Sequence, residues 1–142
     1  MSPFIHLPTE KSLMKAQLLF VDDEEALRSL MAEALADHGY EVTTAPNGRE
    51  ALLLLRSKRR FVIVITDFSM PEGVSGLDVI MEATRAQPEA RLVVASGLSR
   101  SQLPPFPPAV TFVPKPYRLE QLVAAIEHGV PRDPHGIAPS GR

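Results

Sequence analysis

The chain has 142 residues, of which 44% are hydrophobic and 23% charged, with a formal net charge of −2 and no cysteine. A single domain of this length can bury a full hydrophobic core. The near-neutral charge argues against nucleic acid or an anionic membrane as the main partner. The lack of cysteine excludes a disulfide framework and a thiolate metal site. No apolar run reaches the ~20 residues of a membrane span, so we expect a cytoplasmic protein.

Both ends of the chain lack the hydrophobic periodicity of folded structure. Residues 1–14 contain two prolines and no apolar stretch of the signal-peptide type, so we expect a disordered leader. Met14, which almost directly precedes the first apolar run, is a candidate alternative start. Residues 130–142 are rich in proline and glycine and predict a disordered tail. The folded domain is therefore expected over residues 15–129.

Between these ends, short apolar runs alternate five times with stretches in which apolar residues lie three or four positions apart. The runs are typical of strands and the stretches of amphipathic helices. The expected strands cover residues 18–21, 40–45, 61–65, 91–95 and 110–113, and the expected helices cover 27–35, 49–57, 77–84 and 119–126. Uninterrupted apolar strands are typical of a parallel sheet that helices cover on both faces. Short right-handed connections then favour a doubly wound α/β fold with five parallel strands.

The connection between the last two strands is the exception to this alternation. The segment from Leu98 to Pro108 contains four prolines, so at most one short helical turn fits near residues 99–103. We therefore expect the fourth helix to be shortened.

Polar residues stand at the ends of four of the expected strands. Asp22 and Asp23 follow the first strand, Asp67 the third, Ser96 the fourth and Lys115 the fifth. Ligands of such sheets bind beyond the carboxyl ends of the strands, where these side chains would meet. Each residue alone has a purely structural alternative: an aspartate can cap the next helix, a serine can end a strand, and a lysine can pair with the acids.

Taken together, these residues predict phosphoryl transfer to Asp67. Three crowded carboxylates raise one another's pKa values unless a cation lies among them, and Mg²⁺ prefers such oxygen ligands. A carboxylate can attack phosphorus to form an aspartyl phosphate. The transferred group then needs its oxygens neutralised, which the metal, the Lys115 ammonium and the Ser96 hydroxyl with backbone N–H groups could do.

The same residues, in the same order and spacing, resemble the signature of response-regulator receiver domains of two-component signalling. The matching motifs are Asp22-Asp23-Glu24, Asp67 followed by Met70-Pro71, Ser96, and Lys115-Pro116, and they span about residues 16–129. The resemblance implies a flavodoxin-like fold with strand order 2-1-3-4-5. It also implies that Asp67 accepts a phosphoryl group from the phosphohistidine of a histidine kinase or histidine phosphotransfer protein. Such a chain is not an enzyme beyond its own phosphorylation and dephosphorylation.

The resemblance further implies how the metal is held. Asp22 and Asp23 match the family's acidic metal pair, with Asp23 the more direct ligand to Mg²⁺. Asp67 is a ligand as well as the acceptor, and the backbone carbonyl of Ser69 matches the remaining protein ligand.

Three further positions match the family's switch and phosphate-binding residues. Ser96 matches the switch hydroxyl, Phe112 the switch aromatic residue, and Lys115 the phosphate-binding lysine, whose bond to Pro116 is usually cis in this family. For Phe112, ordinary core packing is the competing interpretation.

The short segment between Ser96 and Lys115 departs from the family pattern and is more similar to receivers of hybrid histidine kinases. Our hypothesis is that residues 97–109 still move on phosphorylation but present a different face to partners. The residues outside the domain are too few for a DNA-binding or enzymatic output domain. We therefore expect the chain to signal to a protein partner or to pass the phosphoryl group onward.

Two other functions stay open at this point. A phosphatase of the haloacid-dehalogenase type also uses an aspartate after a strand with Mg²⁺, but it requires a second Asp two positions on, where this chain has Ser69. A receiver-like adaptor that is never phosphorylated is the other alternative, and the filled acid, serine and lysine positions count against it.

Overall fold

The computed structural model describes residues 15–71 and 73–128. They form one five-stranded parallel sheet in the order β2-β1-β3-β4-β5. The strands are β1 (Ala16–Val21), β2 (Tyr40–Ala45), β3 (Ile63–Asp67), β4 (Arg91–Ser96) and β5 (Val110–Pro114). The helices are α2 (Glu25–Asp37), α3 (Gly48–Arg56), α4 (Gly76–Ala86), the 3-10 helix η1 (Arg100–Gln102) and α5 (Leu119–His128). The predicted fold class and strand order are confirmed, whereas the predicted leader, tail and alternative start lie outside the described residues.

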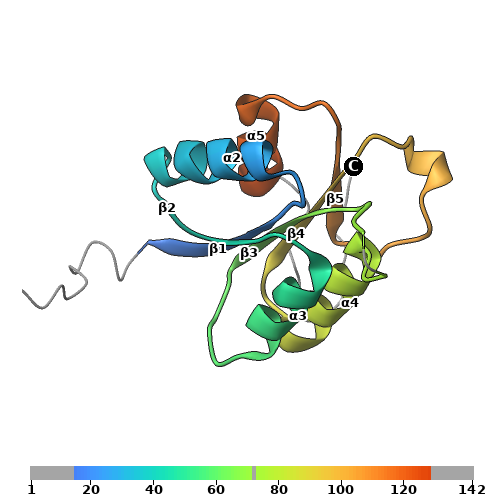
Figure 1. Cartoon of the computed structure of the whole chain (residues 1–142), viewed down its shortest axis with the longest axis horizontal. Helices are drawn as coiled ribbons and strands as arrows, with labels where there is room; N and C mark the ends of the chain where they lie inside the picture. The colour runs from blue at the N-terminus through green and yellow to red at the C-terminus, as the bar shows by residue number, and fades with distance from the viewer. Residues whose placement is uncertain (1–14, 72, 129–142) are drawn as a thin grey trace, which may run out of the picture.

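The helices cover both faces of the sheet, as the uninterrupted apolar strands require. Helices α2 and α5 lie on one face, and α3 and α4 lie on the other (Figure 1). Alternate residues of β3 enter the two cores: Ile63 and Ile65 pack with the α2 and α5 side, and Val64 packs with the α3 and α4 side. Every residue of β3 is buried, which is expected of a central strand in a doubly covered sheet.

The boundaries of β3 differ from the prediction by two residues. Phe61 and Val62 precede the strand, and the side chain of Val62 is exposed. The buried side chain of Gln87 holds this connection, because it accepts a hydrogen bond from the Phe61 N–H at 3.2 Å and donates to the carbonyl of Arg59 at 2.9 Å. The strand also ends two residues later than predicted, so that Asp67 is its last residue.

The start of α4 differs by one residue from the prediction, which began this helix at residue 77. Ser75 is the N-cap of α4, and it forms a reciprocal capping box with Asp78. The helix begins at Gly76, whose N–H donates to the carbonyl of Phe68 at 2.8 Å. The capped helix start therefore lies directly against the residue that follows Asp67.

The shortened fourth helix is confirmed. Only the three residues of η1 are helical between β4 and β5, and η1 lies at the right-hand edge of the molecule in Figure 1. The half-buried Phe106, which has prolines on both sides, packs against the core between the sheet and α3 and α4. A single aromatic side chain of the proline segment thus contributes to the core at the position of the shortened fourth helix.

Candidate functional site

The strand register explains why the polar residues meet. Val21 of β1 lies opposite Thr66 of β3, so the next residues, Asp22 and Asp67, are neighbours. Ser96 of β4 lies opposite Pro114 of β5, so Lys115 comes one residue beyond that pair. The Lys115 N–H donates to the carbonyl of Ser96 at 2.8 Å, which extends the ladder by one step. The structure therefore brings together the residues that the sequence placed at strand ends.

The three aspartates form one cluster. One carboxylate oxygen from each of Asp22, Asp23 and Asp67 lies within 4.8 Å of the others. Asp22 and Asp67 are buried, whereas Asp23 is exposed. Within residues 15–71 and 73–128, this is the only such group of three or more His, Cys, Asp or Glu side chains. All donors are hard oxygens, which matches the ligand preference of Mg²⁺.

Neither aspartate of the β1 pair serves as the N-cap of α2. That position is Glu24, and the first helical residue is Glu25. Asp22 instead accepts a hydrogen bond from the Glu24 N–H at 2.8 Å through Oδ1. This bond fixes the turn between β1 and α2 and leaves the other oxygen, Oδ2, directed to Lys115. The capping alternative raised by the sequence is therefore wrong for these two residues.

Lys115 is the cationic partner of the cluster. Its Nζ lies 3.2 Å from Oδ2 of Asp67 and 3.4 Å from Oδ2 of Asp22. Burial alone would lower the pKa of Lys115, but the charges and hydrogen bonds of Asp67 and Asp22 outweigh burial and raise the pKa above its ordinary value. The ammonium therefore stays charged. The Lys115–Pro116 peptide bond is cis, as the resemblance implied.

Asp67 is a buried carboxylate that lies beside two other carboxylates. Burial, together with the negative charges of Asp22 and Asp23, raises the pKa of Asp67 to about 6, although the positive charge of Lys115 acts in the opposite direction. The side chain keeps 7% of its surface exposed. A second cation near the carboxylates would favour the ionised form, which is the form that can act as a nucleophile.

Ser96 and Phe112, the two predicted switch residues, lie on neighbouring strands. Ser96 is buried, and its Oγ accepts a hydrogen bond from the Leu98 N–H at 2.9 Å. Phe112 is only half-buried, and the guanidinium of Arg100 lies 5.7 Å from its ring centroid. The competing interpretation of Phe112 as an ordinary buried core residue is therefore not supported. Ser69, whose carbonyl is the predicted metal ligand, is exposed in the loop after β3, and its role stays a prediction.

Sequence reasoning missed three residues around the cluster. Arg28 of α2 donates to the backbone carbonyl of Asp22 at 2.9 Å. Burial raises the pKa of Tyr117, and the nearby charges of Asp22 and Asp67 raise it further, which places this phenol close to the acids. An alanine at Gly76 would put its Cβ 2.3 Å from the Asp67 carbonyl oxygen. Only helical spacing for Arg28, and position next to Lys115-Pro116 for Tyr117, could have suggested these roles.

Comparison with known proteins identifies the family. The family described as response regulator receiver domain matches residues 18–127. The chain belongs to this family. It is 30% identical over 114 residues to the response regulator receiver protein CpdR of Brucella abortus, covering 78% of this chain and 93% of CpdR. No helix among the described residues has the length and apolar character needed to cross a membrane.

Solved structures support the same assignment. The receiver domain of the hybrid histidine kinase CckA is 32% identical with a TM-score of 0.68, and the match covers 80% of this chain and 97% of that domain. TrrA of Thermotoga maritima, solved in complex with Mg²⁺ and BeF, is 34% identical with a TM-score of 0.69, and the match covers 80% and 97% of the two chains. Some curated relatives are much longer: the chain spans 24% of NtrC of Azospirillum brasilense and 12% of the sensor kinase CckA of Brucella abortus.

Proposed function

We propose that Asp67 is the phosphoacceptor of this receiver domain and that Asp22, Asp23, Ser96 and Lys115 form the site around it. The observation that carries the proposal is that the Asp67 carboxylate lies in one cluster with two other carboxylates and only 3.2 Å from the Lys115 ammonium. Repulsion among the clustered carboxylates destabilises the fold unless a cation binds between them, and such costly clusters are typical of functional sites. Phosphoryl transfer in a receiver domain requires both the cation and the acceptor carboxylate, which accounts for the cluster.

The reaction transfers a phosphoryl group from a phosphohistidine of a kinase or phosphotransfer protein. An oxygen of Asp67 attacks phosphorus, an O–P bond forms, the N–P bond of the phosphohistidine breaks, and the imidazole leaves with the electron pair. Lys115, already 3.2 Å from the acceptor oxygen, is close enough to pair with a phosphoryl oxygen instead. Rotation of the Ser96 hydroxyl would add a hydrogen bond to another oxygen.

We infer that Mg²⁺ is the cofactor, because all side-chain donors of the cluster are carboxylate oxygens. Asp22, Asp23 and Asp67 would hold the ion, with the exposed Asp23 the more direct ligand of the β1 pair and the Ser69 carbonyl as a further ligand. When bound, the ion would neutralise charge on the phosphoryl oxygens. The relative TrrA was solved with Mg²⁺ and BeF, a combination that suits a site of this composition.

The proposed partners are proteins. A histidine kinase or histidine phosphotransfer protein would supply the phosphoryl group, and a downstream protein or a second phosphotransfer protein would receive the signal. The net charge of −2 gives no support for a nucleic-acid partner. A cytoplasmic location is part of the same proposal.

Labelling with radioactive acetyl phosphate tests the proposal. We expect stoichiometric, Mg²⁺-dependent labelling that is stable to acid, is released by hydroxylamine, and is absent from the Asp67→Asn variant. The exposed Asp37, at the end of α2, provides a matched Asp→Asn control that should label normally. Labelling of Asp67→Asn to the same level as the parent chain would overturn the assignment.

A turnover assay and the labelling experiment together separate the two alternatives. A haloacid-dehalogenase-type phosphatase would turn over a small ester such as p-nitrophenyl phosphate continuously, whereas the receiver should not. An adaptor that is never phosphorylated would give no label from acetyl phosphate or from any histidine kinase. Neither alternative has support from the comparisons, in which the whole domain matches receiver proteins.

A further inference from the structure

Three contacts of the segment 97–109 involve residues at or beside the proposed site. The Leu98 N–H donates to Ser96 Oγ at 2.9 Å. Arg100 lies over the ring of Phe112. Phe106 makes an edge-to-face contact with Phe68, with ring centroids 5.9 Å apart and planes inclined at 78°. The first two contacts involve predicted switch residues, and the third involves the residue directly after Asp67.

The backbone beside Asp67 has little room to move. The Phe68 N–H donates to the carbonyl of Ala95 at 2.9 Å, and the Phe68 carbonyl accepts from the Gly76 N–H at 2.8 Å. The Phe68 Cα lies only 2.6 Å from the position that a Cβ on Gly76 would occupy. A group added to Asp67 therefore cannot be accommodated by a shift of this backbone toward α4.

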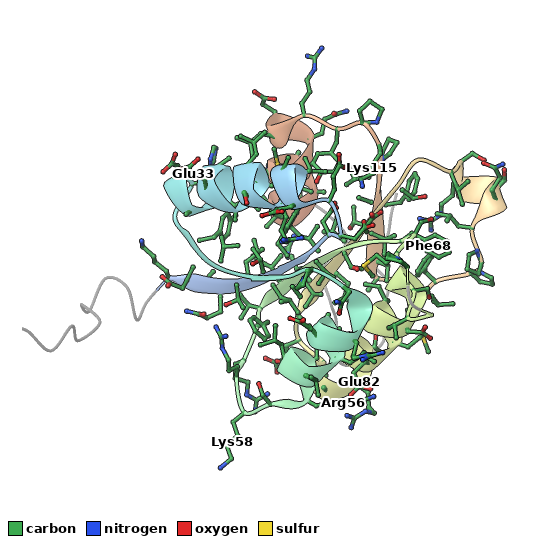
Figure 2. The ribbon with its side chains drawn as sticks, viewed as in Figure 1. Glu33, Arg56, Lys58, Phe68, Glu82 and Lys115 are labelled. Carbon is green, nitrogen blue, oxygen red and sulfur yellow. The ribbon has the colours of Figure 1, made fainter. Side chains whose placement is uncertain are left out.

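Since the backbone of Phe68 is fixed, its side chain is the part of this residue that can change position. It is half-buried at the end of β3, and Figure 2 shows it on the side of the molecule opposite the start of β1. Its partner Phe106 belongs to a segment without regular structure, with exposed prolines Pro105 and Pro108 close by. Closely packed aromatic rings transmit a displacement, whereas an irregular segment can take it up.

We propose that Phe106 is a positioning residue that links the phosphorylation state of Asp67 to the position of the segment 97–109, through the ring of Phe68. This link rests on the proposed function and adds to it a route that belongs to this chain. The route leads from Phe68, next to Asp67, directly to Phe106 in the proline segment. It does not require Ser96 or Phe112. The surface that changes includes Leu98, which is 38% exposed, and the prolines beside Phe106.

A single fluorophore tests the link, because the natural chain has no tryptophan. We expect the emission of a Phe106→Trp variant to change when Mg²⁺ and beryllofluoride are added, and to return when they are removed. A Leu53→Trp variant is the matched control, since Leu53 is on α3, outside the segment 97–109, and is 64% exposed. Its emission should stay constant. Thermal shift of the same samples reports independently whether beryllofluoride binds.

Second substitutions identify the route. In the Phe106→Trp background, Phe68→Leu should keep the thermal shift but reduce the emission change several-fold, while Phe68→Tyr should retain it. Ser96→Ala should leave most of the emission change in place. A response that survives Phe68→Leu and disappears with Ser96→Ala would overturn the proposal, because the serine would then move the segment by itself.

The failure of the link and the failure of the function are distinguishable. A thermal shift with constant emission at position 106 overturns the link alone. No thermal shift in the parent chain overturns the proposed function, and the link with it. If Phe106→Trp does not fold, the parent chain labelled with 4-fluorophenylalanine gives six fluorine signals. The signal that Phe106→Leu removes should then move on addition of Mg²⁺ and beryllofluoride, and a stationary signal would count against the link.

Discussion

At Asp67, burial raises the pKa and the Lys115 ammonium lowers it, and the net result is a testable dependence of stability on pH. The pKa of about 6 in the folded chain lies above the ordinary value of 3.8. The folded state therefore binds this proton more tightly than the unfolded chain does. Ionised Asp67 reduces the free energy of unfolding, and the reduction develops as the pH rises from about 4 to about 6 and stays constant above that.

Asp67→Asn should remove this reduction in the free energy of unfolding, because asparagine carries no charge. In metal-free buffer near pH 8, we expect the variant to be more stable than the parent by ~1–3 kcal/mol, and the difference should disappear below about pH 4. Urea titrations across that range measure it, with Asp37→Asn as the exposed control. A variant that is less stable than the parent at the higher pH would show that Asp67 makes contacts worth more than its buried charge costs.

Lys115 and Asp67 are a coupled pair, and a double-mutant cycle measures the coupling. Lys115→Met should destabilise the metal-free domain, because Asp22 and Asp67 lose the ammonium that lies 3.2–3.4 Å from them. The loss should be smaller in the Asp67→Asn background, with a coupling free energy of ~1–2 kcal/mol. Lys58→Met, at an exposed lysine (Figure 2), is the control and should show no coupling with Asp67→Asn. Additive effects of Lys115→Met and Asp67→Asn would refute the pairing.

The sequence could predict most of the individual site residues for a simple reason. Asp22, Asp67, Ser96 and Lys115 each stand at the end of an apolar strand, and parallel strands end at one edge. Arg28 and Tyr117 could not be predicted in this way, because their roles depend on tertiary contacts. Arg28 donates to the backbone carbonyl of Asp22 in the turn before its own helix, and Tyr117 gains its raised pKa only after burial beside the acids.

At the level of elements, the close approach of α4 to β3 gives the next prediction. Gly76→Ala would place a Cβ 2.3 Å from the Asp67 carbonyl oxygen, so the start of α4 or the end of β3 must shift. We expect a loss of ~1–3 kcal/mol in the free energy of unfolding and slower labelling by acetyl phosphate. Gly97→Ala is the matched stability control, since no atom lies within 4 Å of its added Cβ. Unfolding curves and labelling rates check the two effects. Equal stability of the two variants would show that α4 moves freely.

The elements themselves show where sequence patterns suffice. The four prolines between Leu98 and Pro108 forbid a long helix whatever the tertiary structure, and η1 is only three residues long. Position 61 shows the limit of the same reasoning. Phe61 belongs to an apolar run and is buried, yet it is not in the strand, because Gln87 from another element accepts its N–H. Burial was predictable there, whereas the hydrogen-bond partner was not.

For the molecule as a whole, the acid cluster that we propose as the phosphorylation site also affects the stability of the fold. The sheet order brings β1 and β3 together at the centre, so Asp22 and Asp67 cannot separate without disrupting the pairing of these strands. A ligand that relieves the repulsion among the carboxylates must therefore stabilise the entire domain. The size of this stabilisation depends on the distances between the carboxylates, which cannot be predicted from the sequence.

Mg²⁺ should consequently raise the melting temperature, because the ion binds the folded cluster and not the unfolded chain. The expected gain is about 2.7 kcal/mol when the free ion is at 100 times its dissociation constant. NaCl at the same ionic strength is the control for general screening, and Asp23→Asn should reduce the Mg²⁺ shift without removing a buried charge. Asp67→Asn should combine two opposite changes: a higher melting temperature without Mg²⁺ and a smaller shift with it. A shift that is equal in NaCl, or unchanged in both variants, would mean that the ion acts elsewhere and that the three carboxylates are not its site.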